Sequence, residues 1–381
     1  MKLVKMNMPS QLIVGDGALE RFFEDMKQSG KKRLFILSID IIRPLLAEGI
    51  ASLEAYGVAV ELNEQISAEP TFAEADAIVE QARAFKADAV IGIGGGSVLD
   101  TAKYVAAQVE NNQTYLEVIG NGNLKPRKIY LACLPTTAGT GSEVSPNAIF
   151  LDTNDDEKKG CISPYLVPDA SYVDPLLTVG VPPAITAFTG IDAFTHCLEA
   201  YLNVNHHPVI DQYAIQGMQN IYANLVTCYK NVKDTEARTA VALGSVYGGM
   251  CLGPVNTAAV HALAYPLGSK YHVAHGLSNA LLLPYVLEFN LPACVNRLAA
   301  LAGHLSLEDK GSAEANAAHC VEAITKLITD LNTPLHLSEL GIKKEDLELL
   351  AESGMKVQRL LANNPRQVTY DDALKIYQKA Y

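Results

Sequence analysis

Short apolar runs alternate with amphipathic stretches through the first half of the chain. The runs that predict strands are Leu34–Ser38, Val58–Leu62, Ala89–Ile93 and Ile129–Leu134. Between the second and third runs, apolar residues recur at helical spacing from Thr71 to Lys86, directly after the helix-breaking Pro70. Alternation of strand and helix is typical of a mostly parallel sheet with helices on its faces. We therefore predict an α/β domain.

The pattern changes near residues 173–183, where Asp174-Pro175 and Pro182-Pro183 interrupt the chain. Beyond them strand-like runs largely stop, and Ala- and Leu-rich helical windows follow. The clearest windows are Pro208–Leu225, Glu236–Tyr247 and Ala313–Leu331. A chain of 381 residues also exceeds the usual size of one core. We predict two domains, an α/β domain over residues 1–180 and an all-helical domain over 181–381.

Charge and composition exclude several classes of function. The formal net charge is -12 and the basic residues are dispersed, which disfavours a nucleic-acid partner. No apolar stretch is long enough to span a bilayer, and the N-terminus lacks the pattern of a secretory signal, so a cytoplasmic location is expected. The seven cysteines include no C-x-x-C pair and are expected to be reduced, mostly buried thiols.

A glycine-rich segment follows the predicted strand at residues 89–93. Gly94-Gly95-Gly96-Ser97 leads directly into a helical stretch. Glycines allow close approach of a ligand, and the free N–H groups of a helix start favour a phosphate. Ser97 and Asp100 have the spacing of a capping box, and Lys103 lies one turn later, within reach of a phosphate or of Asp100. The segment departs from G-x-G-x-x-G, so a plain tight turn is the alternative.

A second polar loop, Pro135–Val144, follows another predicted strand. Its hydroxyls and glycines suit contacts with ribose and phosphate. Two such loops at the ends of parallel strands describe a dinucleotide-binding cleft.

Asp192 and His196 are four residues apart in a helical window, so both side chains project from one face. His261 and His275 are fourteen residues apart, and a continuous helix would separate them by roughly 21 Å. Two ligands of one metal ion must lie much closer than that. The chain must therefore turn back between them.

Pro266 and Gly268 are expected to break the helix between these two histidines. One carboxylate and three imidazoles suit a borderline ion such as Fe(II) or Zn(II), rather than Ca²⁺ or Mg²⁺. Taken one at a time, each of the four residues has an alternative role as a surface pair or a hydrogen-bonded core residue.

These segments together resemble the iron-containing (group III) alcohol dehydrogenases, along nearly the whole chain. The matching motifs are Gly94–Ser97 with Asp100 and Lys103, Pro135–Val144, Thr189–His196, His261–Gly268, His275–Ala280 and Asn364–Arg366.

The resemblance implies a dehydroquinate-synthase-like fold, with a nucleotide-binding α/β domain and a helical metal-binding domain that meet at a cleft. It also implies a homodimer or a larger homo-oligomer. The implied metal ligands, which are also the catalytic residues, are Asp192, His196, His261 and His275. The implied coenzyme-binding residues are Asp40, Gly94, Gly95, Gly96, Ser97, Asp100, Thr136, Thr137, Ser142, Val144 and Lys159. Asn147 and Tyr265 are expected beside the substrate.

Two positions depart from the family pattern. Many members have a second histidine four residues after the third ligand, where this chain has Tyr265. Many also have an aspartate after the strand at residues 34–38 that favours NAD. Here the aligned residue is Ile39 or Asp40, so NAD and NADP both stay open.

The resemblance implies reversible hydride transfer between a nicotinamide coenzyme and a small alcohol or aldehyde bound to Fe(II), with Zn(II) as the alternative metal. There are two alternatives to this function. One is a glycerol-dehydrogenase-like zinc enzyme of the same superfamily, against which the full set of four ligands argues. The other is a protein that binds nucleotide and metal without catalysis.

Overall fold

The computed structural model describes residues 2–381, and the chain divides into two compact units. The α/β unit comprises Met6–Thr137 and Gly141–Gly180. The helical unit comprises Val181–Tyr381, the N-terminal residues up to Lys5, and the short segment Ala138–Thr140. The last segment lies inside the predicted α/β domain, yet it packs with the helices. A side chain on Gly139 would meet Thr189 of the helical unit at 2.7 Å, so this contact depends on glycine.

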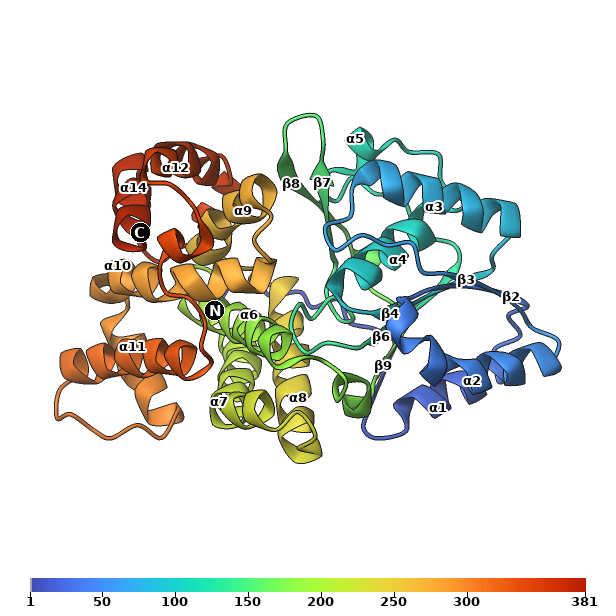
Figure 1. Ribbon diagram of the computed structural model, residues 1–381, viewed down its shortest axis with the longest axis horizontal. Helices are drawn as coiled ribbons and strands as arrows, with labels where there is room; N and C mark the ends of the chain where they lie inside the picture. Colours follow the sequence, from blue (N-terminus) through green and yellow to red (C-terminus); the bar gives the residue numbers. More distant parts are fainter. Residues whose placement is uncertain (1) are drawn as a thin grey trace. The chain divides into compact units, whose positions relative to one another are not determined.

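A six-stranded sheet forms the centre of the α/β unit, with strand order β1-β9-β6-β4-β2-β3 and every pair parallel (Figure 1). Its strands are β1 (Gln11–Val14), β2 (Arg33–Leu37), β3 (Ala59–Asn63), β4 (Ala89–Gly94), β6 (Tyr130–Pro135) and β9 (Ala170–Val173). The predicted parallel sheet is confirmed. The strands β1 and β9 escaped prediction because each has only four residues.

Helices cover both faces of this sheet. They are α1 (Ala18–Gln28), α2 (Arg43–Ala55), α3 (Phe72–Phe85) and α4 (Gly96–Gln108), with the one-turn α5 (Tyr115–Val118). Because successive side chains of a strand point to opposite faces, β2 sends Leu34 and Ile36 into the core beneath α1 and α2. Phe35 and Leu37 enter the core beneath α3 and α4. Continuous apolar runs therefore mark a sheet that is buried on both sides.

The helix predicted over Thr71–Lys86 is α3. Thr71 and Glu74 form a capping box at its start, and Lys86 ends it in the left-handed conformation. A second, three-stranded sheet with order β5-β8-β7 was not predicted. Its strands are β5 (Gly120–Asn121), β7 (Asn147–Asp152) and β8 (Glu157–Ile162). Strand β8 begins Glu-Lys-Lys and lacks the apolar run that would indicate a strand.

The helical unit contains no strand among the residues described after Val181, as predicted. Its helices are α6 (Pro183–Leu202), α7 (Pro208–Lys230), α8 (Thr235–Leu252), α9 (Ala259–Tyr271), α10 (His275–His304), α11 (Ala313–Asp330), α12 (Leu347–Met355), α13 (Gln358–Leu361) and α14 (Tyr370–Lys379). Short 3-10 turns complete the chain at Asp40–Ile42, Pro164–Leu166, Pro175–Thr178, Leu337–Leu340 and Lys344–Asp346.

Helix α6 lies at the centre of the helical unit, against α7, α8 and α10 (Figure 1). Every residue from Gly190 to Leu202 is buried. A helix that is buried all round is mostly apolar, so its few polar side chains must find partners inside the protein. Those of α6 include Asp192, His196 and Glu199.

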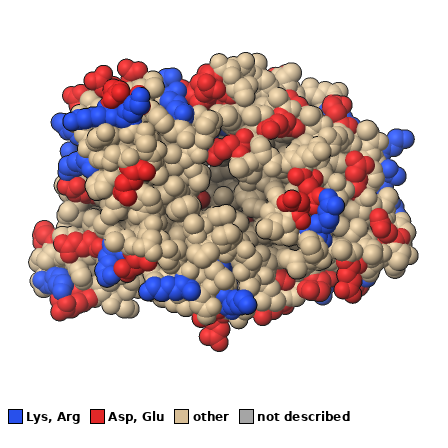
Figure 2. Space-filling model, in the orientation of Figure 1, with Lys and Arg blue, Asp and Glu red and all other residues tan. Residues whose placement is uncertain are grey.

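All seven cysteines are free and buried, as predicted. Burial raises the thiol pKa of Cys197, the neighbour of His196, to about 12, so this cysteine is a poor nucleophile. Figure 2 shows one face of the molecule, on which Lys and Arg side chains are interspersed with Asp and Glu. Among the helices described, none is both long and apolar enough to cross a membrane.

Candidate metal centre and coenzyme loops

Asp192 and His196 project from the same face of α6, as their spacing predicts. Asp192 is 2% exposed and His196 is 5% exposed, so both polar groups lie deep in the helical unit. The distance from His196 Nε2 to Asp192 Oδ1 is 3.8 Å. Helix α6 therefore supplies one carboxylate and one imidazole to a single buried point.

His261 lies in the first turn of α9, and His275 is the first residue of α10. The expected break at Pro266 and Gly268 was wrong, because α9 continues through both residues to Tyr271. The chain turns instead at His272, which ends α9 in the left-handed conformation with a φ of 55°. A proline in a helix removes one backbone hydrogen bond, and here the packing of α9 tolerates that loss.

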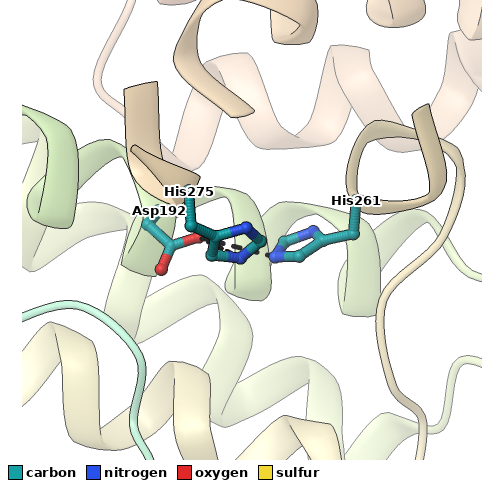
Figure 3. Close-up of side chains that lie close together, drawn as sticks. All are labelled: Asp192, His261 and His275. Carbon is teal, nitrogen blue, oxygen red and sulfur yellow. Dashed lines mark ion pairs between the residues drawn. The ribbon is translucent and has the colours of Figure 1, made fainter. Parts of the chain in front are cut away.

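The three segments bring three imidazole groups around one carboxylate oxygen. Asp192 Oδ1 lies 3.5 Å from His261 Nε2 and 3.6 Å from His275 Nε2 (Figure 3). The donor atoms of Asp192, His261 and His275 all lie within 4.8 Å of one another. The rings of His196 and His261 stack, with centroids 4.7 Å apart and planes inclined by 22°.

These separations fit a bound divalent ion. Metal bonds to imidazole and carboxylate are about 2.1 Å long, so two donors at a tetrahedral angle lie roughly 3.4 Å apart. The distances from Asp192 Oδ1 to the three Nε2 atoms, 3.5 to 3.8 Å, lie close to this value. Asp192, His261 and His275 form a group that could hold one ion, whereas His196 lies outside this group and, of its members, is close only to Asp192 and His261.

Gly276 allows α10 to begin close to α6. A β-carbon at this position would lie 2.3 Å from the carbonyl oxygen of Phe188 and 3.4 Å from Cβ of Asp192. Any side chain at residue 276 would therefore push the start of α10 away from α6. The glycine that follows His275 sets the distance between two of the predicted metal ligands, Asp192 and His275.

Two further side chains of the site were missed by the sequence reasoning. Glu199 is 4% exposed and binds the far nitrogen of His261, with Oε2 2.5 Å from Nδ1. Asn279 is fully buried and donates from its amide nitrogen to Asp192 Oδ1 at 2.7 Å. The sequence spacing of both residues could have pointed to the site. Glu199 continues the polar stripe of Asp192 and His196 on α6, and Asn279 lies one turn after His275.

The charges in the pocket favour a cation. Burial opposes the charge on Asp192, but the surrounding histidines outweigh it and hold the pKa of this carboxyl far below its usual range. Burial lowers the pKa of His196 to about 4, which leaves its imidazole neutral at pH 7. For His261, burial is outweighed by the carboxylates of Glu199 and Asp192, and the pKa rises to about 9. A metal ion at this histidine would have to displace its proton.

Tyr265 lies one turn after His261 and is half-buried. Its ring centroid is 5.8 Å from that of His275. The phenol therefore borders the candidate metal centre.

The two predicted coenzyme loops begin side by side in the α/β unit. Strands β4 and β6 are paired in parallel, with Gly94 opposite Pro135, and Thr136 donates its N–H to the carbonyl of Gly94 at 3.0 Å. Helix α4 begins at Gly96, with Gly95 as its N-cap. The predicted capping box of Ser97 and Asp100 is wrong, because no side chain caps this helix. Its first N–H groups are left available to a phosphate.

Ser97, Asp100 and Lys103 make other contacts. The Ser97 hydroxyl donates to the carbonyl of Ala68 at 2.6 Å. Lys103 is fully buried and donates from Nζ to both the carbonyl and the hydroxyl of Ser142, each at 2.9 Å. Asp100 accepts from the Ser142 hydroxyl and, at 2.9 Å, from the N–H of Ile149. Asp100, Lys103 and Ser142 thus join α4 to the second loop from inside the protein.

The other predicted coenzyme residues are spread over the α/β unit. Thr136 and Val144 are buried, whereas Thr137 is half-buried beside Gly95. Lys159 lies on β8 and pairs with Asp152 and Asp155, each at 2.6 Å.

Asp40 is exposed after β2, and Asn147 begins β7 with its side-chain oxygen buried. Ile39, the other residue that aligns with the ribose-binding position, packs partly into the cores on both faces of the sheet.

Comparison with known proteins covers both halves of the chain. Residues 9–175 match the family model described as iron-containing alcohol dehydrogenase, and residues 186–381 match the one described as Fe-containing alcohol dehydrogenase family, C-terminal. Long-chain-alcohol dehydrogenase 1 of Geobacillus thermodenitrificans is 35% identical over 388 residues, which cover 100% of this chain and 98% of that protein.

Solved structures resemble the fold along its whole length. An alcohol dehydrogenase from Oenococcus oeni is 32% identical, with a TM-score of 0.95 and full coverage of both chains. A sulfoacetaldehyde reductase from Bifidobacterium kashiwanohense, in complex with NAD+, is 25% identical, with a TM-score of 0.88 and coverage of 100% of this chain and 99% of that one.

Proposed function

This chain belongs to the iron-containing alcohol dehydrogenase family, and from that premise we propose that Asp192, His196, His261 and His275 bind its metal ion. The chain is an oxidoreductase that interconverts alcohols and aldehydes with a nicotinamide coenzyme. The observation that supports the ligand assignment is the position of three imidazole nitrogens 3.5 to 3.8 Å from one carboxylate oxygen.

When bound by these residues, Fe(II) would supply a Lewis acid for the alcohol or aldehyde oxygen, and the nicotinamide coenzyme would supply or accept the hydride. The protein holds the ligands in place. Asp192 and His196 are held in place by the buried helix α6. The turn at His272 brings His275 back toward His261. The burial of Asp192 and His261 limits access of water to the ligands. Tyr265 places an aromatic ring beside His275, where it would limit the size of the substrate.

We propose that the coenzyme binds along the loops after β4 and β6, with its pyrophosphate at the start of α4 and the adenosine ribose toward β2. Charge favours NAD over NADP. Asp40 and Glu64 follow the adjacent parallel strands β2 and β3, and Arg43 donates to Glu64 at 3.1 Å. Two carboxylates and one guanidinium leave a net negative charge, which would repel a 2′-phosphate.

Kinetics with both coenzymes test this preference. We expect a higher kcat/KM for NADH than for NADPH. Asp40→Asn should bring the kcat/KM values for the two coenzymes closer together. A preference for NADPH in the unaltered chain would contradict the charge argument.

The substrates we propose are small alcohols and aldehydes. The activity assay is NADH oxidation with such aldehydes, before and after chelation of the metal. His261→Ala should lose both the metal and the activity. His304→Ala, which changes an exposed histidine at the end of α10, should lose neither. Full turnover in the chelated protein would reject the metal-dependent reaction.

Reconstitution separates the two candidate metals. Protein stripped of metal and reloaded with Fe(II) should recover more activity than protein reloaded with Zn(II). The opposite result would favour the glycerol-dehydrogenase-like zinc enzyme. Tight binding of NADH and metal without turnover on any alcohol would favour a non-catalytic protein. A homodimer and a cytoplasmic location are further parts of the proposal, and sedimentation analysis would check the first of these.

A further inference from the structure

Glu199 is a buried carboxylate that the assigned metal ligands do not include. It lies on α6, seven residues after Asp192, and both of its oxygens are engaged with α9. Oε2 is 2.5 Å from Nδ1 of His261, and Oε1 accepts the backbone N–H of Val260 at 2.6 Å. A carboxylate that is held at both oxygens has one orientation, so it also fixes the orientation of the imidazole.

The contact with His261 determines which ring nitrogen is free. A carboxylate only accepts hydrogen bonds, so Nδ1 of His261 must carry the hydrogen that points to Glu199. Nε2, which faces Asp192, is then the nitrogen that can offer its lone pair to a metal ion. In many metalloproteins a carboxylate behind a histidine ligand acts in this way.

The contact with Val260 is a helix cap. The first N–H groups of a helix have no partner within the helix, and the N-cap residue of α9, Ala258, has no side chain that could accept one. Glu199, which lies on α6, caps α9 instead by accepting the N–H of Val260. Its negative charge at the start of α9 is also favourable to the helix dipole.

Charge balance gives Glu199 a third effect. A divalent ion with Asp192 as its only carboxylate ligand leaves one positive charge in a buried pocket. Glu199, 4% exposed and one imidazole away, neutralises that charge. Buried charges are stable only when they are compensated nearby.

We propose that Glu199 is a positioning residue of the metal centre, which selects the metal-binding form of His261 and neutralises the bound dication. This inference rests on the proposed function, because it requires the ion to bind at His261.

Glu199→Gln provides the sharpest test, because it changes one atom and the charge. One amide oxygen can still accept the N–H of Val260, but the amide nitrogen then faces Nδ1 of His261 as a donor. The histidine would be driven to carry its hydrogen on Nε2, where it blocks the metal. We expect the dissociation constant for Co(II), measured in competition with a chromophoric chelator, to rise by about 10- to 100-fold. The visible spectrum of bound Co(II) should also change as His261 is lost from the ligand set.

Asp234→Asn is the matched control. Asp234 caps α8 in the same unit by accepting the N–H of Ala237 at 3.0 Å, so the variant changes a capping carboxylate to an amide away from the ligands. Both variants should lower the melting temperature, but only Glu199→Gln should alter Co(II) affinity and the Co(II) spectrum. A purely structural role for Glu199 would lower stability alone, and equal affinity in Glu199→Gln and the unaltered chain would overturn the proposal.

Glu199→Asp extends the test if the glutamine variant does not fold. It keeps the charge but withdraws the oxygens by one methylene, so Co(II) affinity should fall at least several-fold, and unchanged affinity would overturn the inference. Failure of the proposed function would give a result that differs from failure of the role of Glu199. In that case the unaltered chain would bind no Co(II), or His261→Ala would bind it as tightly as the unaltered chain.

Discussion

The side-chain amide of Asn279 donates to Asp192 Oδ1 at 2.7 Å and thereby joins α10 to the central carboxylate of the metal centre. The same nitrogen lies 3.2 Å from Nε2 of His261 and 3.3 Å from Nε2 of His275. One neutral residue therefore contacts three of the four proposed ligands. Like Glu199, it comes from a helix that also supplies a ligand.

Replacement of Asn279 by alanine should weaken metal binding by about 10-fold, because Asp192 loses the donor that fixes its orientation. Competition with a chelator measures the change. Asn290→Ala is the control, since Asn290 lies on the same helix and exchanges amide hydrogen bonds with Asn364. It should lower stability without a change in metal affinity, and equal effects of the two variants on the metal would count against the role of Asn279.

Gly276→Ala should separate α10 from α6. The new β-carbon would overlap the carbonyl of Phe188, so the helix start must move by several tenths of an ångström or more and carry His275 with it. We expect at least a 10-fold loss of metal affinity and of kcat/KM.

The control for this variant is Gly303→Ala. It lies in the last turn of α10, where no atom is within 4 Å of the new methyl group. It should be neutral or stabilise the unit by up to about 1 kcal/mol. Wild-type metal affinity in Gly276→Ala would show that the close approach of the helices is unnecessary.

Substitutions of Lys103 and Asp100 should have strongly non-additive effects on the free energy of unfolding. Burial lowers the pKa of Lys103 and raises that of Asp100, and each offsets the cost of the other's charge. Lys103→Met would leave Asp100 buried without its cation and should cost about 3–5 kcal/mol in the free energy of unfolding. The double variant with Asp100→Asn should recover part of this loss. Denaturant unfolding of all four proteins measures the coupling, and additive losses would refute it.

Glu143 should make the stability of the α/β unit depend on pH. Burial raises the pKa of this carboxyl to about 7, despite an opposing effect of Lys103. A raised carboxyl pKa means that the folded state holds the proton more tightly than the unfolded state. The stabilising contribution is therefore complete below pH 4.5, the usual value, and is lost as the pH rises through about 7.

Glu143→Gln should remove this dependence. The difference in unfolding free energy between the variant and the unaltered chain should grow in favour of the variant from pH 5 to pH 8, by on the order of 2–3 kcal/mol. Glu54→Gln, at an exposed position of the same unit, should show no such trend. A difference that is flat with pH would contradict the raised pKa.

Local patterns were enough to predict the sheet, most of the long helices and the pair on α6. Asp192 and His196 could be placed together because four residues make about one helical turn. The break between His261 and His275 was misplaced at Pro266, because a sequence does not reveal that packing holds a helix together through a proline. The true break at His272 depends on a left-handed backbone that histidine seldom adopts.

Side-chain partners that come from distant segments were beyond the sequence patterns. Ser97 and Asp100 have capping-box spacing, but Asp100 bonds instead to Ser142 and Ile149, which only the folded sheet brings close. Glu199 was visible as the third polar residue of a stripe on α6. Its partners Val260 and His261 were not, because they depend on how α9 packs against α6.

The origin of the ligands on α6, α9 and α10 also has a consequence for folding. An unfolded chain offers at most the local pair Asp192 and His196, since the other two ligands lie far along the sequence. The complete set of proposed donors exists only after the three helices have docked, so an ion held by them would bind the native helical unit far more tightly than any earlier species. Metal binding would then come late in folding and would chiefly slow unfolding. The rate of metal release would therefore report the rate at which this unit opens.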